Sequence, residues 1–99
     1  MTDKEIIDRI GYFRTKAGLT QRALSVEIDV NTGYINRLEC KKDFLPSMSV
    51  LMRIIEACGT TAEEFFYSSP ETYASDKILL DKIKNLPSDK REALMKLLV

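Results

Sequence analysis

The sequence predicts an all-α protein, in which a bundle of five short helices is followed by two more. Apolar residues recur every three or four positions, and no segment shows the strict alternation of apolar and polar residues that is typical of a half-buried strand. The apolar stretches are divided into short units by residues that cap helices. Thr, Ser or Asn stands at the start of a unit and Gly at the end of several. The 99 residues are enough for one compact core of ~60–70 residues with an appended element, and too few for two full cores.

The first two helices are marked at their ends. One is expected over residues 3–17, from a capping box at Thr2 and Glu5 to a helix stop at Gly18. Thr20 is the expected N-cap of a second, shorter helix. The apolar residues expected on the inward faces of these helices are Ile6, Ile10, Phe13, Ala17, Ala23, Leu24 and Ile28.

Three more helices are predicted in the same way. Asn31 is the expected cap of a third helix over residues 32–40, Ser47 caps a fourth helix that ends at Gly59, and a capping box begins a fifth at Thr61. The residues expected inside are Ile35, Leu38, Val50, Leu51, Ile54, Ile55, Cys58, Phe65, Phe66 and Tyr67.

The chain is expected to divide at residues 68–70, the only Ser/Pro-rich segment, into a first domain over 1–67 and a helical pair over 71–99. The first helix of the pair would run from Pro70 to Lys84. The pair carries more apolar side chains than two short helices can bury against each other, so we expect a dimerisation segment and a homodimer. The alternative is that these helices pack on the first domain of the same chain.

Composition excludes most catalytic chemistry. The chain has no histidine, which removes Ser/His/Asp and Cys/His nucleophilic pairs and histidine metal sites, and it has no glycine-rich phosphate loop. No enzymatic activity, metal, cofactor or small-molecule ligand is therefore expected.

Cys40 and Cys58 form no CxxC motif and follow no export signal, a usage typical of reduced thiols in the cytoplasm. No apolar run approaches membrane-spanning length.

Charge is balanced over the chain but uneven along it. Fifteen basic and fifteen acidic residues give a formal net charge of zero, which argues against a global positive field. Residues 9–42 nevertheless hold seven basic residues and three acidic ones, a net charge of +4. Any basic surface must therefore be local, and this segment carries a local excess of positive charge.

Residues 19–39 predict a helix-turn-helix, in which two short helices are joined by a tight turn and the second enters the major groove of DNA. If Ile35 and Leu38 face inward, the outward residues of the helix over 32–40 are of types that can read bases. Arginine can bind guanine, asparagine can bind adenine, a threonine methyl can meet the thymine methyl, and a glycine lets the backbone come close. The candidates for base reading are Thr32, Gly33, Asn36 and Arg37.

Alternatives remain for each of these features. The two helices could be an ordinary helical hairpin, although the combination of caps, turn length, polar outer face and local charge favours DNA binding. Asn36 and Arg37 could be a solvated helix face. Lys41 and Lys42 could simply complement the helix dipole.

The run from Leu19 through Glu39, together with Lys42, Pro46-Ser47, the apolar helix over 51–59 and the Glu-Phe-Phe at 64–66, closely resembles the Cro/phage-repressor type helix-turn-helix family of transcriptional regulators. The resemblance covers about two thirds of the chain and implies a five-helix DNA-binding bundle, here followed by the two C-terminal helices. It also implies dimers that bind short palindromic operators in double-stranded DNA.

The resemblance assigns roles to further residues. It implies a structural pair between Arg14 in the first helix and Glu39 in the third. The chain departs from the family pattern at Asp29, where a glycine is usual in the turn, at Ser25, and in a longer loop over 43–45. The residues assigned to DNA phosphates are Thr20, Gln21, Arg22, Tyr34, Lys41 and Lys42, and the resemblance implies that Gln21 also braces the recognition helix.

The function predicted from the sequence is therefore sequence-specific binding of double-stranded DNA by a transcriptional regulator. Repression by occlusion is the simplest mechanism for so small a chain, because it needs no ligand domain. The alternative is a protein-interaction adaptor or antitoxin-like module that uses the C-terminal helices.

Overall fold

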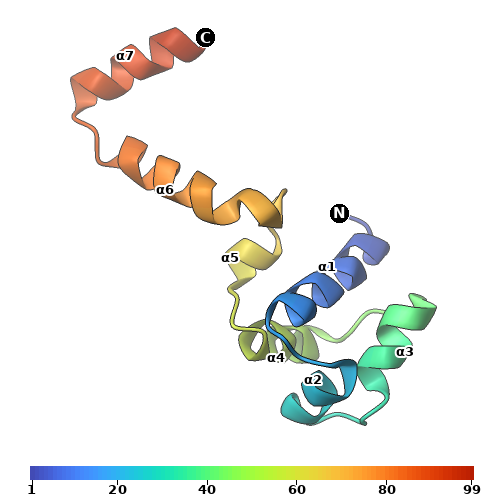
Figure 1. Cartoon of the computed structure of the whole chain (residues 1–99). Helices are drawn as coiled ribbons and strands as arrows, with labels where there is room; N and C mark the ends of the chain where they lie inside the picture. Colours follow the sequence, from blue (N-terminus) through green and yellow to red (C-terminus); the bar gives the residue numbers. More distant parts are fainter. The chain divides into compact units, whose positions relative to one another are not determined.

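The computed structural model describes residues 1–99 and contains seven α-helices, a short 3-10 helix and no strand, which confirms the all-α prediction (Figure 1). The chain forms two compact units, Met1–Phe66 and Tyr67–Val99. The first unit holds α1 (Asp3–Lys16), α2 (Gln21–Glu27), α3 (Tyr34–Lys41), α4 (Met48–Ala57) and α5 (Ala62–Phe65). The second holds η1 (Pro70–Thr72), α6 (Tyr73–Lys84) and α7 (Ser88–Leu98).

Four of the predicted hydroxyl caps are confirmed. Each hydroxyl oxygen accepts a hydrogen bond from the backbone N–H three residues later, which satisfies one of the free donors at the start of a helix. These caps are Thr2, Thr20, Ser47 and Thr61.

The third helix begins later than predicted. The sequence placed it over 32–40 with Asn31 as its cap, whereas α3 starts at Tyr34 and Gly33 is its N-cap. The Asn31 side chain accepts a hydrogen bond from the Gly33 N–H at 2.9 Å. This local turn competes with helix formation, so Thr32 and Gly33 lie in the turn before α3.

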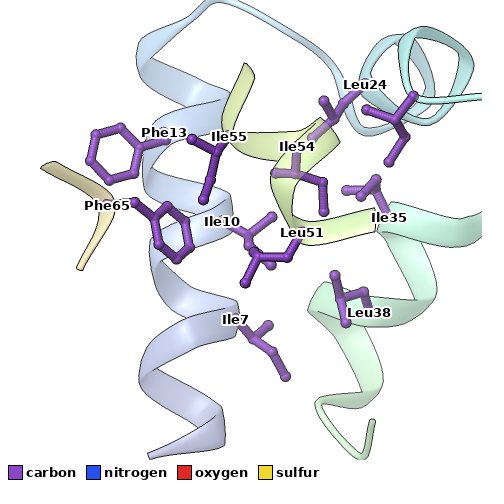
Figure 2. Close-up of a cluster of buried hydrophobic side chains, with 11 residues drawn as sticks. Ile7, Ile10, Phe13, Leu24, Ile35, Leu38, Leu51, Ile54, Ile55 and Phe65 are labelled. Carbon is purple, nitrogen blue, oxygen red and sulfur yellow. The ribbon is translucent and has the colours of Figure 1, made fainter. Parts of the chain in front are cut away.

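The core of the first unit is made by α1 and α4 together with the inner faces of α2, α3 and α5 (Figure 2). Phe65 is fully buried and packs against Phe13, with ring centroids 5.6 Å apart, which holds the single turn of α5 in place. Burying each such side chain stabilises the fold by ~1.5–3 kcal/mol. The buried apolar residues are Ile7, Ile10, Phe13, Leu24, Ile28, Ile35, Leu38, Leu51, Ile54, Ile55 and Phe65.

Three residues predicted to face inward do not. Ala17 is exposed because it is the C-cap of α1, beyond the last turn that reaches the core. Ala23 is exposed because Leu24 and Ser25 carry the inner face of α2. Phe66 is 43% exposed, since it follows the last residue of α5.

The second unit has no comparable core. Neither α6 nor α7 contains a buried residue. The start of α6 is held by polar and aromatic contacts, in which the Tyr67 hydroxyl donates to Asp76 at 2.8 Å and the Tyr67 ring meets Tyr73 edge-on. None of the helices combines the length and the apolar character that a membrane span requires.

Candidate nucleic-acid interface

The turn between α2 and α3 is built on one residue in the left-handed region. Asp29 has φ 60°, a conformation that aspartate tolerates better than most residues and that allows the chain to reverse. The backbone N–H of Val30 donates to the Ser25 carbonyl at 3.1 Å and closes the turn. The two helices of the predicted helix-turn-helix are therefore joined by a short connection that backbone hydrogen bonds hold.

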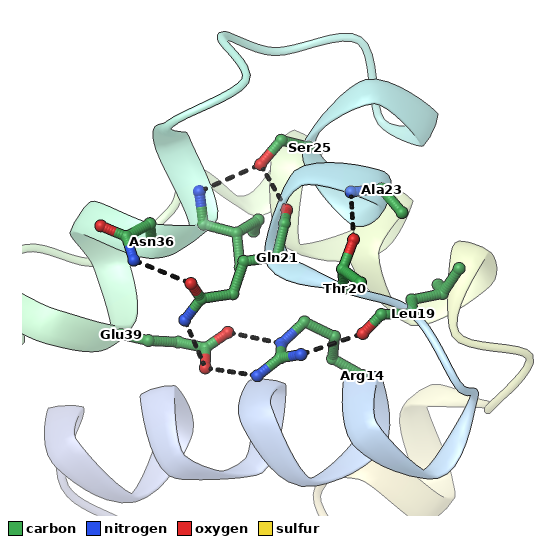
Figure 3. A network of polar contacts seen from close by, with 9 residues as sticks. Arg14, Leu19, Thr20, Gln21, Ala23, Ser25, Asn36 and Glu39 are labelled. Carbon is green, nitrogen blue, oxygen red and sulfur yellow. Dashed lines mark hydrogen bonds and ion pairs between the residues drawn. The ribbon is translucent and has the colours of Figure 1, made fainter.

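Ser25 fastens the two helices to each other. Its buried hydroxyl donates to the Gln21 carbonyl at 2.8 Å and accepts from the backbone N–H of Ile35 at 3.2 Å (Figure 3). The N–H of Ile35 lies in the first turn of α3, where no partner exists within the helix. The serine at this departure from the family pattern thus supplies a hydroxyl that α3 needs.

Arg14 and Glu39 join α1 to the end of α3. The arginine donates from Nε to Oε2 at 2.8 Å and from Nη2 to Oε1 at 2.9 Å, a bidentate pair, and from Nη1 to the Leu19 carbonyl at 2.9 Å. The two side chains are 17% and 15% exposed. The hydrogen bond to Glu39 raises the pKa of Arg14, so the arginine stays charged.

Gly11 makes room for this pair, and sequence reasoning missed it. A Cβ atom at Gly11 would lie 3.3 Å from Glu39 Oε1, closer than side chains normally approach. A glycine inside a helix costs about 1 kcal/mol relative to alanine. A glycine in the middle of a predicted helix, with no turn to explain it, was the signal in the sequence that another group comes close there.

Gln21 and Asn36 connect the ion pair to the outer face of α3. The Asn36 Nδ2 donates to Gln21 Oε1 at 2.8 Å, and the Gln21 Nε2 donates to Glu39 Oε1 at 3.4 Å (Figure 3). The structure thus brings together four of the residues that the sequence singled out. Arg14 and Glu39 lie at the inner end of the network and Asn36 lies at its exposed end.

The remaining base-reading candidates lie at the start of α3. Thr32 is exposed in the turn, Gly33 is the half-buried N-cap, and Arg37 is exposed one turn into the helix. The side chain of Arg37 makes no hydrogen bond or ion pair, and neither do the side chains of Arg22 and Lys41, which are also exposed. Cationic side chains without a partner in the chain therefore lie on α2, in the middle of α3 and at the last residue of α3.

Lys42 is placed differently from Lys41. It adopts φ 54° as the C-cap of α3, and its Nζ forms an ion pair with Asp8 at 2.8 Å. No local pattern in the sequence pointed to Asp8, which lies 34 positions from Lys42. Both side chains are exposed, so the pair is weak and can be exchanged for another anion.

The last two phosphate candidates also have structural partners. Thr20 caps α2, where its Oγ1 accepts from the Ala23 N–H at 3.0 Å. The Tyr34 ring packs edge-on against Phe44, with centroids 5.8 Å apart, and burial raises the pKa of its hydroxyl. The longer loop after α3 is therefore used to cover Tyr34.

Arg53, on α4, is a third residue whose contact could not be read from the sequence, after Gly11 and Asp8. Its Nη1 donates to the Ile28 carbonyl at 2.6 Å, beyond the last residue of α2. A cation at this position satisfies a carbonyl that has no partner within the helix and complements its dipole. It thereby links α4 to the end of α2.

The chain was compared with known protein families, curated proteins and solved structures. A family model described as a helix-turn-helix matches residues 10–65, which extend from the middle of α1 to the end of α5. No curated protein and no solved structure matches the chain.

Proposed function

Since the chain belongs to the Cro/phage-repressor type helix-turn-helix family and is a DNA-binding transcription regulator, we propose that it is a repressor that binds a short palindromic operator as a homodimer. The observation that supports this most is the outer face of α3. Asn36 and Arg37 are exposed there and stand beside cations that have no partner within the chain.

Base reading is assigned to the first half of α3 and the turn before it. Arg37 has all its donors free for guanine O6 and N7, and Asn36 can pair with adenine N6 and N7. Thr32 offers a methyl group to thymine, and Gly33 keeps the helix start free of a side chain, so the backbone can approach the groove.

Phosphate binding is assigned to both helices of the unit. Arg22 and Lys41 are free and exposed, and Lys42 would exchange its bond to Asp8 for a phosphate. The remaining candidates for phosphate contact are Thr20, Gln21 and Tyr34.

Dimerisation is assigned to residues 71–99. One helix-turn-helix reads one half-site, and a two-fold dimer places a second recognition helix about one turn of DNA, ~34 Å, away. The helices α6 and α7 bury none of their apolar side chains, which supports a second copy of the chain as their partner. A dimer on an operator would repress by occluding the promoter.

Selection of bound duplexes from a random pool tests the DNA-binding part. We expect enrichment of a palindrome. Replacing Arg37 by Ala should cost about 1–3 kcal/mol on that operator and relax the preference at one base pair in each half-site. In contrast, Lys41→Ala should weaken binding to all duplexes evenly and reduce the salt dependence by about one unit of slope. An unchanged preference in the Arg37 variant would contradict the base-reading role.

Sedimentation equilibrium tests the dimer. The full chain should dimerise at tens of micromolar or below, a range typical of specific contacts (roughly 6–8 kcal/mol). A full chain with Leu79→Lys and Leu97→Lys, which changes two exposed side chains, should remain monomeric. If the wild-type chain is monomeric and enriches no duplex, the C-terminal helices fit a protein-interaction module better than a dimer interface.

A further inference from the structure

The Glu39 carboxylate determines the direction of a chain of hydrogen bonds. It receives two hydrogen bonds from Arg14 at 2.8 and 2.9 Å, so it is held as an anion that only accepts. Any further group that meets Glu39 Oε1 must donate to it.

Gln21 is the group that meets this oxygen. Its amide has an oxygen at one corner and an NH₂ at the other, and only the NH₂ can face an acceptor. Nε2 therefore points to Glu39, and Oε1 points to the other side, where Asn36 Nδ2 donates to it at 2.8 Å. Both amides are oriented by the ion pair.

The orientation decides what Asn36 presents to the outside. One of its two N–H groups is used by Gln21, which leaves one N–H donor and the Oδ1 acceptor. Adenine offers the matching pattern in the major groove, an N7 acceptor beside an N6 donor. Guanine offers two acceptors, O6 and N7, so one of them would face Oδ1.

We propose that Gln21, held by the Arg14–Glu39 pair, is a positioning residue that makes Asn36 prefer adenine to guanine. This inference rests on the proposed function, in which Asn36 faces the bases. It adds that Gln21, which was assigned to a phosphate, also acts on base preference. The Arg14–Glu39 pair then takes part in sequence specificity, although it does not face the DNA.

Gly11 shows that the inner end of this chain is closely fitted. Glu39 Oε1 accepts both from Arg14 and from Gln21, and this is the atom that a Cβ at position 11 would approach to 3.3 Å. The space for the oxygen that orients Gln21 is thus provided by a missing side chain.

The experiment measures the affinities of the full-length protein for two duplexes. One is the operator enriched by selection, and the other carries guanine in place of the adenine whose preference is lost in Asn36→Ala. Gln21→Met keeps the length of the side chain and the Arg14–Glu39 pair but removes the hydrogen bonds. It should lower the adenine-to-guanine affinity ratio by about 3- to 10-fold, the contribution of one hydrogen bond.

A second variant changes Glu39, the residue that orients Gln21. In Glu39→Gln the new amide can donate as well as accept, so it no longer dictates the orientation of Gln21, and the affinity ratio should fall by a similar factor. Glu27→Gln is the matched control, since it makes the same chemical change on an exposed residue of α2. It should leave the ratio unchanged. Circular dichroism confirms that each variant is folded at the temperature of the binding measurement.

The outcomes separate this inference from the proposed function. If Gln21→Met weakens both duplexes equally, Gln21 binds a phosphate or braces α3, and the inference is overturned. If Asn36→Ala changes no base preference, the inference is also overturned, while sequence-specific binding stands. If the wild-type protein enriches no sequence, both fail.

Discussion

The two units of the chain use similar apolar residues with opposite results. The first unit buries eleven hydrophobic side chains, whereas α6 and α7 bury none and expose Leu79 at 60% and Leu97 at 83%. Five short helices can surround a common interior, and two consecutive helices cannot. An apolar helical pattern therefore predicts a helix with one buried face, but it does not predict whether the same chain or another one covers that face.

The largest expected effect contrasts two leucines, one from each unit. Leu38→Ala should lower the free energy of unfolding of the first unit by about 3–5 kcal/mol, because Leu38 is fully buried and its removal leaves a cavity. Leu79→Ala should change it by less than about 0.5 kcal/mol. Urea unfolding, followed at a protein concentration where the chain is monomeric, gives both values. Equal losses would show that α6 belongs to the same cooperative core.

The next effect concerns the two ion pairs of the first unit. Glu39→Gln should cost about 2–4 kcal/mol, since it leaves Arg14 charged, largely enclosed and without a counter-charge. Asp8→Asn breaks the exposed pair with Lys42 by the same chemical change and should cost at most ~1 kcal/mol. Both values come from urea unfolding at low and high salt. A loss below ~1 kcal/mol for Glu39→Gln would mean that solvent screens the Arg14 pair as it screens the other.

A smaller effect is expected at the joint between α2 and α3. Ser25→Ala removes the acceptor of the buried Ile35 N–H and should cost about 1–2 kcal/mol. Ser49→Ala is the control, because Ser49 is exposed in α4 and should contribute less than about 0.5 kcal/mol. Thermal unfolding measures both. If the two substitutions lowered the free energy of unfolding equally, the hydroxyl of Ser25 would not be what holds α2 and α3 together.

The smallest effect uses the two cysteines as probes. Cys40 is exposed, while Cys58 is half-buried and burial raises the pKa of its thiol. A higher pKa means less thiolate at a given pH, and burial also limits access of the reagent, so Cys58 should be alkylated more slowly than Cys40 at pH 8. Mass spectrometry of the labelled chain gives the two rates. In urea the rates should converge, and a difference that persists there would not come from the fold.

Local signals predicted much of the fold. The four hydroxyl caps could be read from the sequence because a cap acts within three residues of itself. The prediction failed where two local signals competed, as at Asn31, whose side chain forms a turn with Gly33 and delays the start of α3. It also failed for Ala23 and Phe66, because the apolar character of a residue does not say which side of a short helix faces the core.

The site was predicted less completely than the fold. The outward position of Asn36 and Arg37 follows from helical periodicity once Ile35 and Leu38 are inside. The roles of Gly11 and of Asp8 could not be predicted in this way. Each depends on a residue of α3 or its C-cap that lies far away in the sequence and is brought near only by packing.

Four helix starts, the apolar residues available for burial and the outward position of Asn36 and Arg37 on α3 could be read from the sequence. These properties depend on neighbours within one or two helical turns. Only the tertiary structure decided how the polar side chains are joined, since Gln21 lies 15 positions from Asn36 and 18 from Glu39. The direction of those hydrogen bonds is a tertiary property as well. An amide can turn either edge to its neighbour, and it is oriented here because packing brings it against a carboxylate that can only accept.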